Sequence, residues 1–404
     1  MKKLKIALLA SSLLPRVGGA EVVVHNLAEG LRREKHRVDV ITWWGQCRVM
    51  RHLVAYPVRP FLPRSFTWSG VGTWKRRGVA GLTMGLQVAF YQARFRYDLW
   101  HIHLAFPGAA LAAGTLARMG VPFLVTCHGA DVQTVPGIRY GLRLNPYVDK
   151  AICAALRQAT GVAAISRSIR EKLQEMGVDP SRIFDVNNGI NLDALRARPG
   201  RREEARRALG LPSDRKIILT VGRHDRVKNM ALIPKILVEV VRTHCDVLWV
   251  IAGRENDPIA AEAQQLGVGD HLHVMPEIAL DGNVGKTLEF PDARTVNLYH
   301  ASDVYVMTSL IEGMPLVLME SMAAGLPIVA SDVPGCRDLI ERTKAGLLAD
   351  VANPADFAAQ IGEVLSDASA RRKLIEAGSV AAGAWAWPQV VREHVALYRK
   401  ICEV

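Results

Sequence analysis

Two glutamates in one short segment have the spacing to bind a ligand rich in hydroxyl groups. Glu312 and Glu320 lie in EGMPLVLMESMAAGLP, which follows the strand-like run DVYVMTS. Pro315 is typical of the first turn of a helix, so we expect Glu312 in the loop before that helix. Glu320 would lie about five residues into the helix, which is about 7–8 Å beyond the helix start at about 1.5 Å per residue. An apolar, Ala- and Gly-rich helix rarely carries an interior Glu without a partner, so we favour a ligand over incidental glutamates on an exposed helix.

A pair of cations could neutralise a diphosphate. Arg223 and Lys228 stand five residues apart in GRHDRVKN, directly after the apolar run KIILTV. Arg can fork to two phosphate oxygens, and Lys supplies a compact charge. One of the two glutamates could therefore bind a sugar and the other a ribose, with phosphates between them on this pair and on the helix N–H groups. Two solvated loop charges are the alternative interpretation.

Two more loops follow strand-like runs. Gly18 and Gly19 open a helical pattern, where close backbone approach and unpaired N–H groups favour a phosphate. A plain turn is the alternative, and the spacing is not G-x-G-x-x-G, which weakens a dinucleotide interpretation. His128, in CHGAD after VPFLVT, is placed to face a ligand, and a hydrogen-bonded structural histidine is the alternative.

Short strand-like runs alternate with helical patterns along the whole chain. This alternation predicts an α/β fold of βαβ units around parallel sheets, in which ligands bind at the carboxyl ends of strands. The strands are expected at 5–10, 38–42, 99–103, 123–126, 162–166, 184–186, 216–221, 247–252, 271–274, 304–308, 328–330 and 346–348. Helices are expected at 21–33, 109–118, 355–365 and 389–402.

The composition changes near 191–214, where the chain is polar, charged and carries two prolines. We interpret this segment as a hinge region between two α/β domains, 1–195 and 196–385. The 404 residues, 50% hydrophobic and 22% charged, exclude a collagen-like or disordered chain. The six cysteines form no C-x-x-C pair, which disfavours a zinc site or a disulfide framework and favours a reducing compartment.

The start of the chain, MKKLKIALLASSLL, imitates a secretory signal. No small-residue cleavage site follows, and an amphipathic pattern continues through 21–31, so we favour a first buried strand. The longest apolar stretches, near 79–90 and 104–117, do not reach about 18 residues, so no transmembrane helix is expected.

Taken together, these motifs resemble the retaining glycosyltransferases of family 4, which have the GT-B fold. The resemblance runs from GGAE through CHGAD, AISRSIREKL, VNNGIN, VGRHDRVKN and AGRE to EGMPLVLMESMAAGLPIVASDVPG, which matches the family's Glu-x7-Glu signature. It implies two Rossmann-like domains whose parallel sheets face an interdomain cleft. Residues 1–195 would bind the acceptor and 196–385 the nucleotide sugar, and a C-terminal helix within 386–404 would cross back to the N-terminal domain.

The resemblance also implies a role for each motif. Glu320 would hydrogen-bond the donor ribose, Glu312 would contact the transferred sugar, and His128 would face the sugar and the reacting centre. Arg223 and Lys228 would neutralise the diphosphate. The expected catalytic residues are His128, Arg223, Lys228 and Glu312. The expected donor contacts are Gly18, Gly19, Arg223, Lys228, Glu312, Gly313, Met314, Pro315, Leu316, Val317 and Glu320. The residues expected to meet the acceptor or line the cleft are Glu21, Asp131, Ser166 and Asn188.

The family reaction keeps the anomeric configuration and usually needs no bound metal. We therefore expect a UDP- or GDP-sugar donor, with no cofactor or metal ion, and the sequence carries no Asp-x-Asp motif with a clear metal role. The resemblance implies a same-face substitution in which the departing phosphate helps to deprotonate the acceptor. A GT-B sugar-nucleotide epimerase, a transferase with a small soluble acceptor and a scaffold without activity are the alternatives. EGMP replaces the commoner EGFG or EGFP, and 278–291 resembles an insertion that is either a surface loop or an active-site element.

Positive charge is concentrated at the start of the chain. Residues 1–100 hold 17 Lys and Arg against 5 Asp and Glu, whereas the other 304 residues hold 34 of each. Within 43–98, nine of these cations accompany Trp43, Trp44, Trp68 and Trp74, a combination that suits an anionic membrane surface. We therefore expect a lipid-linked or cell-envelope glycan acceptor on the cytoplasmic face of the membrane, with the protein cytoplasmic or peripheral there. An ordinary acceptor loop is the alternative, and no nucleic-acid motif is present.

Overall fold

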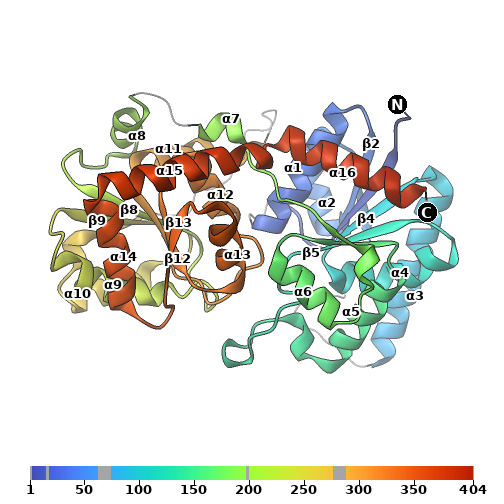
Figure 1. Ribbon diagram of the computed structural model, residues 1–404. Helices are drawn as coiled ribbons and strands as arrows, with labels where there is room; N and C mark the ends of the chain where they lie inside the picture. The colour runs from blue at the N-terminus through green and yellow to red at the C-terminus, as the bar shows by residue number, and fades with distance from the viewer. Residues whose placement is uncertain (1, 15–17, 62–73, 197–199, 276–287, 404) are drawn as a thin grey trace. The chain divides into compact units, whose positions relative to one another are not determined.

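The computed structural model describes residues 2–14, 18–61, 74–196, 200–275 and 288–403, without the side chains of 74–80. The chain folds into two compact units (Figure 1). The first comprises Met1–Gly189, Asp281–Leu288 and Trp387–Val404, and the second comprises Ile190–Leu280 and Glu289–Ala386.

The first unit is built on a seven-stranded parallel sheet in the order β3-β2-β1-β4-β5-β6-β7. Its central strands are nearly continuous apolar runs, because helices cover both faces of such a sheet. The strands are β1 (Lys5–Ala10), β2 (Arg37–Trp43), β3 (Val58–Phe61), β4 (Leu99–His103), β5 (Phe123–Cys127), β6 (Gly161–Ala164) and β7 (Ile183–Asp185). The α-helices are α1 (Gly19–Arg33), α2 (Trp44–Met50), α3 (Trp74–Phe95), α4 (Ala110–Arg118), α5 (Pro146–Gln158), α6 (Arg167–Glu175) and α16 (Trp387–Cys402).

The second unit is built on a six-stranded parallel sheet in the order β10-β9-β8-β11-β12-β13. Its strands are β8 (Lys216–Val221), β9 (Val247–Ala252), β10 (Leu272–Met275), β11 (Val304–Met307), β12 (Ile328–Ser331) and β13 (Gly346–Ala349). Its α-helices are α7 (Leu192–Leu195), α8 (Arg201–Leu209), α9 (Ile233–Val241), α10 (Asp257–Gln265), α11 (Ala293–Ala301), α12 (Leu316–Ala323), α13 (Pro334–Thr343), α14 (Pro354–Ser366) and α15 (Ala368–Ala382).

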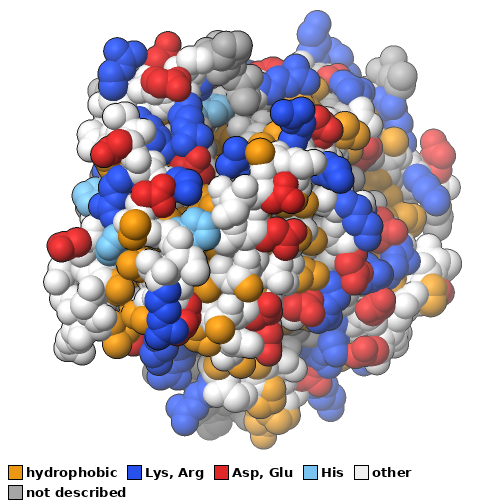
Figure 2. Space-filling view, turned by 60° about the vertical axis from the view of Figure 1, so that its left-hand side comes forward, with side chains coloured by type: hydrophobic (Ala, Val, Ile, Leu, Met, Phe, Trp, Pro, Cys, Tyr) orange, Lys and Arg blue, Asp and Glu red, His pale blue; other side chains and the backbone are white. Residues whose placement is uncertain are grey.

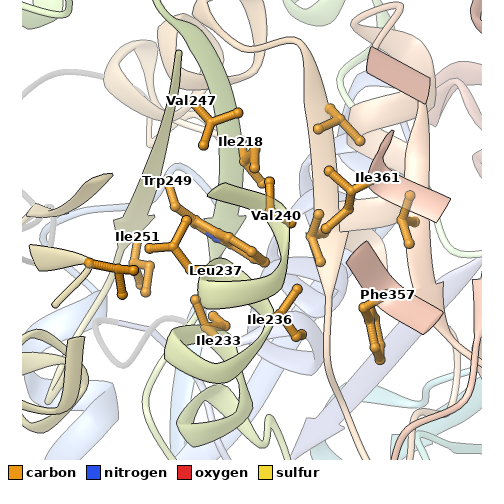
Figure 3. Close-up of a cluster of buried hydrophobic side chains, with 14 of the residues drawn as sticks. Ile218, Ile233, Ile236, Leu237, Val240, Val247, Trp249, Ile251, Phe357 and Ile361 are labelled. Atoms are coloured by element: carbon orange, nitrogen blue, oxygen red, sulfur yellow. The ribbon is translucent and has the colours of Figure 1, made fainter. Parts of the chain in front are cut away.

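A cluster of buried aliphatic and aromatic side chains fixes β8 and β9 against their covering helices (Figure 3). Trp249 on β9 is fully buried beside Leu237 of α9, and Phe357 of α14 belongs to the same cluster. The Trp249 indole N–H donates to Thr220 Oγ1 at 3.1 Å, so its one polar atom is satisfied inside the core. The loops that follow these strands therefore start from a rigid base.

Each sheet reverses its strand order at one point, between β1 and β4 in the first unit and between β8 and β11 in the second. In open parallel sheets, ligands bind outside the carboxyl ends of the strands at such a reversal. The loops after β1, β4, β8 and β11 are therefore the places where functional side chains are expected.

The predicted α/β class with two Rossmann-like domains is confirmed. The strands expected at 5–10, 99–103, 216–221 and 247–252 have the expected bounds. Strand β3 was not predicted, because it is a short edge strand whose sequence, VRPF, has no apolar alternation and includes a proline.

The C-terminal helix α16 packs in the first unit, which confirms the predicted return of the chain. It lies against α1, where a Cβ on Gly30 would come within 2.4 Å of the Val391 side chain. Gly189 similarly lies under the ring of Trp387, so a larger residue there would displace the start of α16.

The prediction that 191–214 is a hinge region is wrong for most of its length, because this segment forms α7 and α8 of the second unit. The charge of α8 has a structural use. The buried Arg206 donates to Asp303 Oδ2 at 3.0 Å and to several backbone carbonyl oxygens, including that of Ala301 at 2.9 Å. The charged composition suggested a solvated linker, but Arg206 in this segment instead anchors α8 to the end of α11 and to Asp303 just beyond it.

The basic, aromatic segment 43–98 divides between core and surface. Phe61 is buried, whereas Trp44, Leu82, Leu86 and Phe90 are exposed, the last three by more than 60%. Phe66 and Trp68 lie outside the described residues, as does the side chain of Trp74. Figure 2, which brings the left-hand side of Figure 1 forward and so does not display this segment, shows basic and acidic side chains interspersed on that other face. Among the described helices, none has the length and apolar character needed to cross a membrane.

Candidate active site

The loop after β8 is organised by an aspartate that sequence reasoning missed. Asp225 Oδ2 accepts from the Arg223 guanidinium at 2.8 Å, and its Oδ1 accepts from the backbone N–H groups of Val227 and Lys228. Burial opposes ionisation of Asp225, but these donors outweigh it and hold its pKa below the ordinary value. The carboxylate thus fixes the loop that presents both predicted cations, and its place in the turn HDRVK is the only sequence signal for it.

The predicted Lys228 and Glu312 form an ion pair, with Lys228 Nζ at 2.6 Å from Glu312 Oε1. The two side chains are 28% and 12% exposed, so the pair is only partly open to solvent. Burial disfavours the charged amine, but Glu312 outweighs this and raises the pKa of Lys228. Lys228 therefore stays positive in the neutral pH range.

The loops after β8 and β11 are also joined through their backbones. Thr308 Oγ1 donates to the Lys228 carbonyl oxygen at 2.8 Å, and the Leu310 N–H donates to the Val227 carbonyl oxygen at 2.7 Å. The Lys228–Glu312 pair is thus held from both sides at the reversal point of the sheet.

Helix α12 begins beside this pair. Pro315 is the N-cap residue rather than part of the first turn, which corrects the sequence prediction by one position. No side chain among the described residues caps the helix, so the N–H groups of Leu316 and Val317 can meet a ligand. The loop ahead of α12 is packed tightly, because a Cβ on Gly335 would come within 2.5 Å of the Glu312 carbonyl oxygen.

Glu320 is in the body of α12, as predicted, and is buried. The Tyr299 hydroxyl donates to its Oε2 at 2.7 Å. Burial raises the pKa of Glu320 to about 7, and the Tyr299 hydrogen bond opposes that rise. Burying a carboxyl group whose charged form is disfavoured in this way costs folding stability. Such a raised pKa is typical of a functional site rather than of a structural glutamate.

Polar atoms around the same loops are buried without a hydrogen-bond partner among the described residues. They are His224 Nδ1, Ser309 Oγ and both side-chain atoms of Asn256. The loops that carry them are tied together, since the His224 N–H donates to the Arg254 carbonyl oxygen at 2.9 Å. Buried groups of this kind are costly unless a ligand or water satisfies them, so they extend the candidate site to the loop after β9. Sequence reasoning missed all three residues.

In the first unit, Gly18 is the N-cap of α1 and Gly19 its first residue. A Cβ on Gly18 would come within 2.5 Å of Glu21 Oε2, so glycine allows Glu21 to fold back over the helix start. No side chain among the described residues caps α1, which leaves its first N–H groups available. The residues just before it, 15–17, lie outside the described part of the chain.

His128 follows β5 and is half-buried. Its Nε2 lies 3.0 Å from Nδ1 of His103 on β4. Burial lowers the pKa of His128 to about 4, so the ring is neutral at physiological pH. Sequence reasoning missed His103, although the H-x-H spacing on a buried strand places His101 and His103 on one face.

Asp131 has a structural position next to His128. Its Oδ1 accepts from the N–H groups of His128 and Gly129, and its Oδ2 accepts from the Ala105 N–H at 2.8 Å. Both carboxylate oxygens therefore hold together the loops after β4 and β5.

Two other predicted residues lie elsewhere in the first unit. Ser166 is the N-cap of α6 and accepts from the Ile169 N–H, so the strand predicted at 162–166 ends before it. Asn188 is buried just before the chain leaves the first unit. Of the predicted insertion 278–291, the described part begins at Leu288, whose carbonyl oxygen lies 3.0 Å from Nε2 of His25 on α1.

Comparison with known proteins gives one consistent result. Residues 17–194 match the model of "Glycosyltransferase Family 4", and residues 201–380 match that of "Glycosyl transferases group 1". The chain is 28% identical, over 99% of both chains, to an uncharacterized glycosyltransferase of Methanocaldococcus jannaschii. It is 30% identical to a D-inositol 3-phosphate glycosyltransferase of Geodermatophilus obscurus, over 76% of this chain and 67% of that protein. HepE of Anabaena, solved in complex with UDP, has a TM-score of 0.79 at 17% identity, covering 98% of this chain and 100% of that chain.

Proposed function

The chain belongs to family 4 of the glycosyltransferases, with the GT-B fold, and on that premise we propose that it transfers a sugar, with retention, from a nucleoside-diphosphate sugar to an acceptor hydroxyl. The second unit binds the donor, and the first unit binds the acceptor. No metal ion takes part, because the protein's own cations and helix start do that electrostatic work.

The observation that carries this proposal is the Lys228–Glu312 pair beside the start of α12. Lys228 stays charged and can neutralise the diphosphate, while the carboxylate of Glu312 can accept hydrogen bonds from sugar hydroxyls. The uncapped N–H groups of α12 add donors and a partial positive charge for the phosphate oxygens. Arg223, held by Asp225, supplies the second cation.

Glu320 binds the donor ribose in this proposal. Its Oε2 already accepts from Tyr299, and Oε1 is left for a hydroxyl group. Its pKa of about 7, which reflects burial, means that part of the population is protonated at neutral pH. Ribose binding should therefore strengthen as the pH rises through this range.

The reaction proceeds on one face of the sugar. The bond from the anomeric carbon to the diphosphate oxygen breaks, the acceptor oxygen bonds to the same face, and its proton passes to the departing phosphate. Lys228 and Arg223 stabilise the charge that develops on the leaving group. The neutral His128 ring supplies a hydrogen bond to the substrate rather than a positive charge.

We propose a UDP-sugar as the first donor to test. HepE of Anabaena, which shares the fold, was solved with UDP and with UDP-glucose. The carboxylate at Glu320 recognises a ribose whatever the base, so a GDP-sugar remains the alternative in the same assay.

The acceptor is a lipid-linked or cell-envelope glycan at an anionic membrane surface. Support comes from the exposed Leu82, Leu86 and Phe90, which recur at helical spacing along α3, and from the exposed Arg94 and Arg96 at its end. Sedimentation with anionic vesicles at low salt tests this: the triple change Leu82→Ser, Leu86→Ser and Phe90→Ser should abolish binding. Leu266→Ser, at an exposed site in the second unit, is the control. An unmodified protein that stays in the supernatant contradicts the membrane proposal and favours a small soluble acceptor.

Release of nucleoside diphosphate from UDP-, GDP- and ADP-sugars, without added metal, tests the transferase proposal. One donor should be hydrolysed slowly, and Glu312→Ala should abolish the release. An epimerised donor with no nucleoside diphosphate would instead identify an epimerase. No release and no thermal stabilisation by any nucleotide would contradict the proposal.

A further inference from the structure

Four buried or half-buried histidines and a tyrosine form a continuous chain in the first unit. His101 and His103 point from β4, with ring centroids 4.2 Å apart. His101 Nδ1 lies 2.7 Å from the Tyr398 hydroxyl of α16, and its Nε2 lies 2.7 Å from Thr126 Oγ1. The His103 ring stacks on that of His128 at 5.3 Å, and His394 of α16 lies 5.9 Å from His101.

This chain is not arranged as a metal centre. Among the described residues, no group of three or more His, Cys, Asp or Glu side chains could hold a metal ion. The hydrogen bonds that its ring nitrogens make are pairwise ones instead, such as that between His103 Nδ1 and His128 Nε2. Burial lowers the pKa of His101, His103, His128 and His394, so each ring is neutral and carries one proton.

One proton therefore lies between His103 Nδ1 and His128 Nε2, and it can belong to either ring. If His128 donates it, His103 must carry its own proton on Nε2. That nitrogen is buried and has no partner among the described residues. If His103 donates from Nδ1, its Nε2 holds only a lone pair. A buried N–H without an acceptor is rarer and more costly than an unused acceptor, so the second arrangement is favoured.

We propose that His103 is a positioning residue that holds His128 in the tautomer protonated on Nδ1, so that His128 offers a fixed N–H donor to a substrate oxygen. No hydrogen bond joins His128 Nδ1 to another described residue, so this proton is free for a ligand. The proposal rests on the proposed function only for the identity of that ligand. It also excludes His128 as a general base, because the nitrogen facing the substrate is already protonated.

The other side chains of this histidine–tyrosine chain keep His103 in place. Tyr398 is buried, which raises its pKa, so its hydroxyl keeps its proton and can donate to His101 Nδ1. His101 can then donate from Nε2 to Thr126. The His101 ring, fixed at both nitrogens, packs against His103 and leaves it one hydrogen-bond partner, His128.

The tautomer can be measured directly in the full-length protein labelled with ¹⁵N-histidine. Long-range ¹H–¹⁵N correlation spectra distinguish the two neutral tautomers, and the signal lost in His128→Asn identifies His128. We expect the Nδ1-protonated form for His128, with a shift of this signal when UDP-glucose is added. A wild-type spectrum with the proton on Nε2 overturns the proposal, whatever the enzyme's activity.

Variants of His103 separate positioning from a purely structural role. His103→Leu removes the donor, and we expect kcat to fall about tenfold or more with little change in the donor KM. His103→Asn places an amide N–H near the former Nδ1, so it should restore most of kcat and the Nδ1-protonated signal. His244→Asn, in the second unit, is the control. Equal loss of kcat in the Leu and Asn variants, with both folded, overturns the proposal. If the wild type transfers nothing, the proposed function fails while the spectrum still decides the tautomer.

Discussion

The two sheets differ in the side chains at the carboxyl ends of their strands. In the first sheet, His103 and His128 are neutral and lie within hydrogen-bond distance of each other. In the second sheet, the corresponding loops carry charged side chains that are partly open to solvent. His128, His103 and Asp131 use their polar atoms mainly within the first unit. Lys228 and Glu312 form an ion pair that is accessible to a ligand. The same fold therefore supports two kinds of edge.

This difference follows from what each edge is proposed to bind. A diphosphate brings charge, so its site needs cations that remain charged, and the Lys228–Glu312 pair provides one. A sugar hydroxyl brings no charge, and it is better met by a fixed neutral donor such as the His128 ring. Changes at the second edge should therefore alter catalysis and donor affinity, and changes at the first edge should alter stability or kcat.

The largest effect is expected for Lys228→Ala. It removes a cation from the proposed leaving-group site and takes away the lysine that pairs with Glu312. Transfer should fall by about 10²–10³-fold, the usual cost of losing one preorganised electrostatic contact. The rate of UDP release from a UDP-sugar is the measurement.

Lys216→Ala is the control for this change, because Lys216 also pairs with a carboxylate, Asp246 at 3.2 Å, but on the surface. It should leave the rate unchanged. A Lys228→Ala enzyme as active as this control would remove Lys228 from its proposed role.

Glu320→Gln should weaken UDP binding by about 1–3 kcal/mol, because an amide accepts a weaker hydrogen bond from ribose than a carboxylate does. It should also stabilise the free protein at alkaline pH. Burial raises the pKa of Glu320 from 4.5 to about 7, so the folded state binds more protons than the unfolded chain between these values. Stability from this group is therefore lost as the pH rises through that window.

The expected gain of Glu320→Gln at pH 8 is up to about 3 kcal/mol and should vanish near pH 4. Calorimetric UDP titrations and thermal unfolding at several pH values measure both effects. Glu363→Gln, at an exposed position, should change neither. A Gln variant whose stability difference from the wild type is independent of pH would show that Glu320 ionises normally.

Asp131→Asn tests the first edge. In the amide, an NH2 group takes the place of one carboxylate oxygen, so a donor faces the backbone N–H that this oxygen accepted. The unfolding free energy should therefore fall by about 1–3 kcal/mol. UDP affinity should not change, because UDP is proposed to bind the second unit. Asp185→Asn, in an exposed ion pair with Arg170, is the matched control. A loss of UDP affinity without a loss of stability would contradict the comparison.

Arg223→Ala should have the smallest effect. Its side chain is 44% exposed, so we expect a loss in UDP affinity of at most about 1 kcal/mol. The loss should shrink as salt rises, since exposed charges are screened. Titrations at low and high salt measure it, with Arg226→Ala on the same loop as the control. An effect that is large and insensitive to salt would mean that Arg223 becomes buried against the ligand.

The sequence predicted those elements and site residues that leave a recognisable pattern in consecutive residues. Strands β1 and β8 are continuous apolar runs followed by Gly- and charge-bearing loops, and their bounds matched the prediction. Glu312 and Lys228 were found because each follows such a run, and parallel strands bring their carboxyl ends to one edge. That the two pair directly could not be predicted, since they are far apart in the chain.

What the sequence did not predict depends on tertiary partners. Arg206 resembles a linker residue until Asp303 and the carbonyl groups around it are known. His103 is one more residue of a buried strand until its neighbour His128, in the loop after β5, is known. Asp225 has an ordinary turn signal, and only its bonds to Arg223 and to the loop backbone show that it orders the cations.

The return of α16 has a consequence for how the protein folds as it is synthesised. The first unit contains the earliest and the latest parts of the chain, whereas the second lies between them. Domains usually complete in the order in which they leave the ribosome, but here the second unit can finish first. Until α16 arrives, His101 lacks the Tyr398 hydroxyl, and the α1 surface at Gly30 lacks Val391. The nascent first unit therefore keeps this part of α1 uncovered, and His101 without one of its two hydrogen bonds, until α16 docks.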